Sequence, residues 1–203
     1  MDDNTSQTVE PERLIHSAKA ELARDLIAIA RRDRWDVALM LVGFAHLAMF
    51  LVCQTLYTRG DRAETHFMAL WGMELLAVLG IFRLVAGRGW HRASPLAGVI
   101  VRVWATFLIL SFNVASLNTL TGWTLDWFKP VWATLSTFVF AMLAWLITPR
   151  FLWLAVLMYF TGLSMVRFPA WNYLIYGVAW FVALQAIALD LRRKRARRKP
   201  SRE

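Results

Sequence analysis

Six long apolar runs fill most of this 203-residue chain and constrain its fold more than any other feature. A helix of roughly 20 apolar residues crosses ~30 Å of hydrocarbon, and five of the runs come close to that length. Only 18% of the residues are charged, whereas about a quarter are charged in a typical soluble domain. The pattern predicts an all-α integral membrane protein, a bundle of six transmembrane helices at residues 37–57, 67–86, 99–120, 131–148, 151–166 and 170–189.

Lys and Arg residues are divided very unevenly between the two ends of these predicted helices. One side carries Arg59, Arg62, Lys129 and Arg167. The other side carries the basic residues of the C-terminal tail together with Arg31, Arg32, Arg34, Arg83, Arg88, Arg92 and Arg150. Basic loops stay in the cytoplasm, so we expect a multi-pass protein of the cell (inner) membrane with both termini cytoplasmic.

Charged segments flank the predicted transmembrane domain, residues 37–190. After a polar segment at 1–11, residues 12–34 carry apolar side chains at helical spacing with charges opposite, which predicts an amphipathic cytoplasmic helix. The tail at 191–203 is strongly basic, and we expect it to contact anionic lipid headgroups. No aromatic residue is interleaved with these charges, so nucleic acid is not an expected partner.

Three polar residues stand near the middle of the predicted helices. Counting ~1.5 Å per residue from the cytoplasmic ends places His46, Glu74 and Asn113 in one broad layer. On the same measure His46 and Glu74 differ in depth by about 5 Å, within reach of side chains on adjacent helices. A charged side chain at the bilayer centre costs at least ~2.5 kcal/mol, so we expect these groups to face the bundle interior and to find partners. They are the predicted binding site for a solute or a proton.

Two interpretations of this layer remain open. A Glu–His pair can exchange a proton near physiological pH, as the coupled site of a transporter does. Alternatively, a protonated Glu74 hydrogen-bonds His46 or Asn113 and ties the helices together. No motif in the chain decides between these two roles.

Two other patterns concern the packing of the helices. Ser111, Ala115 and Thr119 recur at i, i+4 spacing, a small-residue stripe that predicts close helix packing. Most tryptophans fall near predicted helix ends, as in an aromatic belt, but Trp180 lies in the middle of its helix.

Signatures of catalysis and of bound cofactors are few. The sequence contains no H-E-x-x-H, no G-x-S-x-G and no Gly-rich phosphate loop. Haem held between helices usually needs two facing histidines, and only His46 lies deep in an apolar run. The single cysteine, Cys53, excludes an internal disulfide and a multi-cysteine metal site. We therefore predict no catalytic residue and no metal site, and an enzyme is the less favoured interpretation. Any cofactor stays unknown.

The favoured function is a small transporter or channel-type protein that binds a small solute or ion at the layer of His46, Glu74 and Asn113. The alternative is a non-catalytic accessory or scaffold subunit of a larger membrane complex, in which these residues join helices and the outer surfaces contact partners. Membrane-protein partners or a homo-oligomer fit either function.

Overall fold

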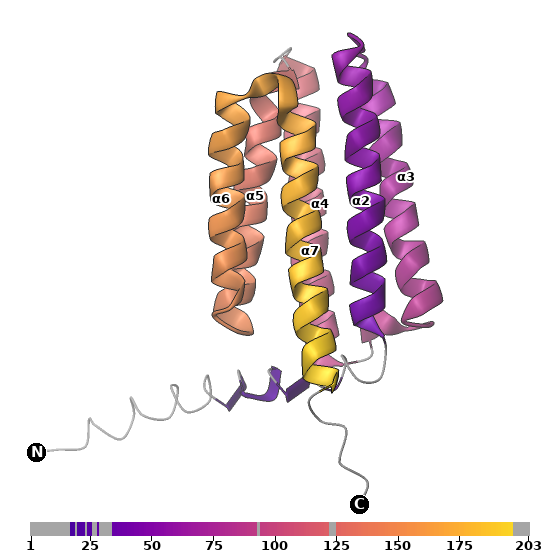
Figure 1. Ribbon diagram of the computed structural model, residues 1–203, viewed down its shortest axis with the longest axis vertical. Helices are drawn as coiled ribbons and strands as arrows, with labels where there is room; N and C mark the ends of the chain where they lie inside the picture. The colour runs from indigo at the N-terminus through magenta and orange to yellow at the C-terminus, as the bar shows by residue number, and fades with distance from the viewer. Residues whose placement is uncertain are drawn as a thin grey trace, which may run out of the picture.

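Figure 1 presents the computed structural model of the protein, which describes residues 17–18, 20–22, 24–25, 28, 34–92, 94–121 and 125–196. This part of the chain is helical with short turns and has no β-strand. The long helices are α2 (Trp35–Thr58), α3 (Glu64–Val85), α4 (Pro95–Thr121), α5 (Leu125–Leu146), α6 (Phe151–Arg167) and α7 (Asn172–Ala196). Short 3-10 turns, η1 (Trp90–Arg92) and η2 (Pro169–Trp171), precede α4 and α7.

The flanking segments are described only in part. Most of the helix predicted at 12–34, and all of residues 1–11 and 197–203, lie outside the described residues. The few described residues between 17 and 28 are helical, and their short pieces run across one end of the bundle, near the end of α7 (Figure 1). Helix α7 itself continues to Ala196, so the first residues of the predicted basic tail extend the last helix.

Five of the described helical segments are long and apolar enough to cross a membrane: Trp35–Thr58, Glu64–Val85, Pro95–Asn118, Lys129–Leu146 and Pro169–Ala196. The remaining helix, α6, is apolar but has 17 residues, a length of about 25 Å. Large apolar side chains cover the outside of the bundle; Leu84 is 85% exposed and Leu120 is 83% exposed. A surface of this kind suits hydrocarbon, and the fold is compatible with a multi-pass membrane protein.

The helices pack mainly as antiparallel neighbours. In Figure 1, α2 and α3 lie on one side, α5 and α6 on the other, and α7 in front of α4 between them. The most extensive contacts join α2 to α7 and α5 to α6, and α3 packs on α2 while α4 packs on α5. By contrast, α3 and α4 are not among the closely packed pairs of the described helices.

The contact between α2 and α7, which we call the α2–α7 seam, brings two backbones unusually close. A Cβ added to Gly177 would lie 2.5 Å from the Cβ of Phe50, and one added to Gly43 would lie 2.6 Å from the amide nitrogen of Gln185. Small residues permit such close approach in helical membrane proteins. The buried Gln54 strengthens the seam, because it donates to the Ala170 carbonyl at 2.8 Å and accepts the Leu174 N–H at 3.2 Å.

Ion pairs join the ends of the first and last described long helices. Asp36, in the first turn of α2, is 2% exposed, and both of its carboxylate oxygens accept hydrogen bonds from Arg195 in the last turn of α7. At the same end, Asp190 pairs with Arg150 and with Lys194. These pairs explain why the helix persists into a basic stretch of sequence, since each neutralises charge that would otherwise repel.

Candidate functional site

His46 on α2 and Glu74 on α3 are in direct contact through His46 Nδ1 and Glu74 Oε1. The two residues stand at one depth because α2 and α3 form an antiparallel hairpin. His46 precedes the last residue of α2, Thr58, by twelve positions, and Glu74 follows the first residue of α3, Glu64, by ten. Both side chains are largely shielded, with 14% and 13% of their surfaces exposed.

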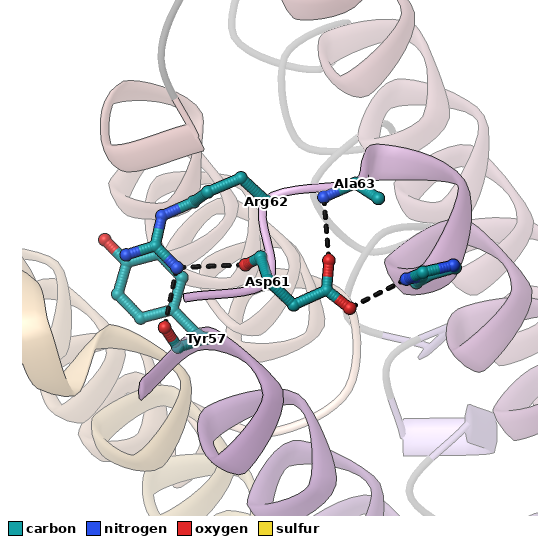
Figure 2. A network of polar contacts seen from close by, with 5 residues as sticks. Tyr57, Asp61, Arg62 and Ala63 are labelled. Carbon is teal, nitrogen blue, oxygen red and sulfur yellow. Dashed lines mark hydrogen bonds and ion pairs between the residues drawn. The ribbon is translucent and has the colours of Figure 1, made fainter. Parts of the chain in front are cut away.

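The turn between the two helices fixes their relative register (Figure 2). Gly60 adopts a φ of 90°, in the left-handed region that favours glycine. Arg62 lies over the Tyr57 ring, 3.8 Å from its centroid, and donates to the Tyr57 carbonyl at 2.6 Å. Asp61 accepts the Ala63 N–H at 2.9 Å, which ties the turn to the start of α3. A turn held by several bonds leaves little freedom for one helix to slide along the other.

The same turn contains an exposed ion pair. Asp61 Oδ2 lies 2.7 Å from His66 Nδ1. The Ala63 N–H, and then His66, hold the pKa of the Asp61 carboxyl below its usual value. The Asp61 side chain retains 22% of its accessible surface, and solvent screening confines its effect to the turn.

The His46–Glu74 pair borders a cavity of about 430 Å³. Residues of α2, α3, α4 and α7 form most of its wall, together with single residues from η1 and α5. The lining includes six tryptophans: Trp35, Trp71, Trp90, Trp104, Trp132 and Trp180. Trp180, the residue in the middle of its helix, is 2% exposed, and its ring centroid lies 5.8 Å from that of His46 and 5.4 Å from that of Trp104.

Four polar side chains line the cavity. Its lining contains His46, Glu74, Ser111 and Tyr176 among residues that are otherwise apolar or aromatic. The Tyr176 hydroxyl lies 2.8 Å from Ser136 Oγ, and because Ser136 donates to the Trp132 carbonyl, Tyr176 is the donor in this bond. By contrast, His46 Nε2 and Ser111 Oγ are buried and have no hydrogen-bond partner among the described residues. Buried polar groups are normally satisfied, so these two atoms mark where a ligand would bind.

Asn113 is not part of this site. Its side chain is exposed and does not line the cavity. Each residue turns an α-helix by about 100°, so Asn113 points about 200° away from Ser111. Counting residues gave the depth of Asn113 but not its direction, and Ser111 is the polar residue that α4 presents to the cavity.

The small-residue stripe of α4 also differs from its predicted role. Ser111 and Ala115 both line the cavity, so their small side chains leave space open at this place. The four-residue spacing of Ser111 and Ala115 therefore identified a face of α4 that points into the bundle. It did not show whether that face contacts a helix or a cavity. The sequence pattern that could have identified the cavity wall is a helical spacing of three to four residues on α4. It joins the lining residues Trp104, Leu108, Ser111 and Ala115.

A second buried polar cluster lies toward the opposite end from Asp36. Lys129 is fully buried, with its Nζ 3.6 Å from the centroid of the Tyr57 ring and 4.5 Å from that of Tyr173. Between α4 and α3, Asn118 donates to Glu64 at 3.3 Å. The sequence placed Lys129 in a loop, but the structure makes it part of α5 and encloses its charge between aromatic faces.

Neither a metal site nor a similarity to known proteins assigns a function to this cavity. The described residues contain no group of three or more His, Cys, Asp or Glu side chains that could hold a metal ion. No protein-family model, curated protein or solved structure matches the chain. The chemistry of the cavity is therefore the main source for a functional conclusion.

Proposed function

We propose that this protein is a small multi-pass membrane transporter that binds its substrate at the His46–Glu74 pair. The observation that carries the proposal is a contacting imidazole and carboxyl group beside a cavity, with His46 Nε2 and Ser111 Oγ left unsatisfied. Ionisable residues within membrane-spanning helices mark substrate or proton pathways by default. Asn113, on the outside of α4, has no part in the proposed site.

The pair is suited to proton-coupled binding because it holds one mobile proton without net charge. With the proton on His46 the pair is an imidazolium and a carboxylate, and with the proton on Glu74 both groups are neutral. Transfer between the two atoms therefore moves charge within the pair but adds none to the membrane interior, where an uncompensated charge is costly. Binding of a substrate group to either partner would bias the proton toward one side.

In this proposal all six helices span a cell membrane, with both termini in the cytoplasm. Support comes from the basic residues at the end of the bundle where α2 starts and α7 stops. The short α6 packs along α5, which would shield its polar ends where the bilayer is thicker than the helix. Labelling of single cysteines with a membrane-impermeant reagent, in a Cys53→Ala background, tests this orientation. Arg59→Cys should react from outside the cell and Arg88→Cys only after permeabilisation.

Proton movement through purified protein in liposomes tests the function. A pH-sensitive dye is trapped inside the liposomes, and the pH outside is lowered. The lumen of liposomes that contain the wild-type protein should acidify faster than that of empty liposomes. His46→Ala should reduce the rate to the empty-liposome value, and His66→Ala should not, because His66 belongs to the exposed turn. Equal rates for His46→Ala and wild type would contradict the proposal.

A subunit role is the second candidate, supported by the outer surface of α6. Trp153, Tyr159 and Phe160 of this helix are 77%, 56% and 58% exposed. Exposed aromatic groups are enriched at protein interfaces as well as at lipid interfaces. If α6 binds a partner, one protein should copurify in mild detergent at fixed stoichiometry and be lost in a Trp153→Ala, Phe160→Ala variant. A homogeneous protein without a partner, with the flux described above, would favour the transporter.

A further inference from the structure

The cavity beside His46 and Glu74 is closed toward both ends of the bundle by aromatic side chains. At the end where α2 starts, the Phe82 ring stacks on Trp90 with centroids 4.6 Å apart, and Trp35 packs edge-on against both. Trp35 is 4% exposed. These three rings line the cavity.

The other end is closed in a similar way. The rings of Trp71 and Trp132, which line the cavity, meet edge to face with centroids 4.4 Å apart. Next to them, Phe67 stacks on Tyr173 at 5.2 Å, and both are buried. A solute dissolved in water would have to pass one of these aromatic layers to reach the His46–Glu74 pair.

Lining residues on the side of α3 and α4 are partly exposed at the surface of the bundle. Leu79 of α3 and Phe112 of α4 line the cavity, yet they expose 47% and 38% of their surfaces. These two helices are also not a closely packed pair in the described part of the chain. Since many large apolar side chains are exposed on the outside of the bundle, this side faces the region that lipid would occupy.

The chemistry of the lining restricts what such an opening can admit. The only charged side chains among the lining residues are His46 and Glu74, which neutralise each other when ionised. An ion would lose its water shell here and gain few replacements. An uncharged hydroxyl or carbonyl group, however, could bond to His46 Nε2 and Ser111 Oγ, two of the buried lining atoms that have no hydrogen-bond partner among the described residues. Tryptophan faces around them would contact the apolar remainder of the molecule.

We propose that the cavity takes an uncharged, lipid-soluble molecule bearing a hydroxyl or carbonyl group, which enters from the bilayer between α3 and α4. This inference rests on the proposed function, because it names the substrate class for the same His46–Glu74 site. The polar group of the ligand binds at His46 and Ser111, and its apolar body lies along the tryptophan-lined wall. The volume of about 430 Å³ lies within the ~300–1,000 Å³ range of small-molecule sites.

Quenching of tryptophan fluorescence by brominated ligands tests the inference, because bromine quenches only indoles that it contacts. The probe is 11-bromoundecanol, compared with 1-bromoundecane, which lacks the hydroxyl group. Purified full-length protein carries Trp145→Phe and Trp153→Phe, since these two tryptophans are strongly exposed and would add background. We expect saturable quenching by the alcohol and about thirty-fold weaker apparent affinity for the bromoalkane, the difference of two ordinary hydrogen bonds.

Two positions of α4 supply matched variants. Ser111→Leu fills the cavity and removes its hydroxyl, and should abolish the saturable quenching. Asn113→Leu introduces the same side chain on the outer face and should leave the quenching intact. Ser111→Ala removes only the hydroxyl, and should weaken binding of the alcohol about five-fold while leaving the bromoalkane unchanged. This smaller variant keeps the test decisive if Ser111→Leu does not fold.

The possible results separate the inference from the proposed function. Equal saturable quenching in wild type, Ser111→Leu and Ser111→Ala would overturn the inference, because the alcohol would then lie elsewhere. Absence of saturable quenching, together with proton flux that depends on His46, would overturn the lipid-soluble substrate and leave the transporter. Absence of both would overturn the two proposals together.

Discussion

The α2–α7 seam and the α3–α4 side of the bundle are built from similar amino acids but pack in opposite ways. Along the seam, Gly43 and Gly177 bring the backbones together, and Gln54 adds hydrogen bonds between the helices. Between α3 and α4, the small residues Ser111 and Ala115 instead border a cavity. Small residues in an apolar helix therefore create space, and the neighbouring side chains decide whether a helix or a cavity occupies it.

The difference also bears on the polar pair. His46 belongs to α2, which packs extensively on α7. Glu74 belongs to α3, whose most extensive contact in the described structure is with α2. A movement of α4 relative to α3 would therefore change access to the cavity while leaving His46 in contact with Glu74. In the proposed transporter, such a movement would allow loading and release.

The largest expected effect comes from disturbing the seam. In Gly177→Ala the new Cβ lies 2.5 Å from the Cβ of Phe50, an atom that cannot move without moving α2. We expect a loss of about 1–3 kcal/mol, or a decrease in Tm of ~3–10 °C, measured by thermal unfolding in detergent. Gly80→Ala on α3 is the matched control, because no atom lies within 4 Å of its added Cβ. Equal decreases for both variants would contradict the contrast between the two regions.

Removing the polar contacts of the seam should have a somewhat smaller effect. Gln54→Leu leaves the Leu174 N–H, one of the donors in the first turn of α7, without its side-chain partner. We expect a loss of about 1–2 kcal/mol in the same unfolding measurement. Gln185→Leu removes one bond, to the Met40 carbonyl at 3.1 Å, and should cost about half as much. A larger loss for Gln185→Leu than for Gln54→Leu would show that the start of α7 is held in another way.

Removing a side-chain group on the α3–α4 side should affect stability less than a substitution in the α2–α7 seam. Ser111→Ala removes a buried hydroxyl group that has no hydrogen-bond partner among the described residues. We therefore expect the free energy of unfolding to change by no more than ~0.5 kcal/mol in either direction. A decrease in Tm as large as that of Gly177→Ala would show that Ser111 holds the fold together and that this side is as tightly packed as the seam.

The smallest effect is expected at the exposed turn between α2 and α3. Because the folded-state pKa of Asp61 is lowered, its ionised form stabilises the turn above the pKa of the unfolded chain, ~4, and this contribution disappears as the pH falls through the folded-state value. The difference in Tm between wild type and Asp61→Asn should be small and constant from pH 5 to pH 6, and should vanish at lower pH. A difference that grows on acidification would contradict this sign.

Much of the fold could be predicted from the sequence because length and hydropathy determine where a helix can cross a membrane. The apolar runs located all the long described helices to within several residues. Counting residues at a helical rise of ~1.5 Å placed His46 beside Glu74 in depth. The rotation of each helix could not be predicted in this way. In a bilayer, lipid-facing and buried side chains are both apolar, so Asn113 and Ser111 looked equally able to point inward. The burial of Lys129 depends on Tyr57 and Tyr173, which are distant in the sequence.

The most direct test of the central claim measures stability and proton flux for Glu74→Gln in the same preparation. We expect flux to fall to that of empty liposomes, whereas Tm should stay within a few degrees of wild type, because an amide can still bond to His46 Nδ1. This result would identify the His46–Glu74 pair as a functional site. Unchanged flux with a large decrease in Tm would contradict the proposed function and show that the pair serves only to join α2 and α3.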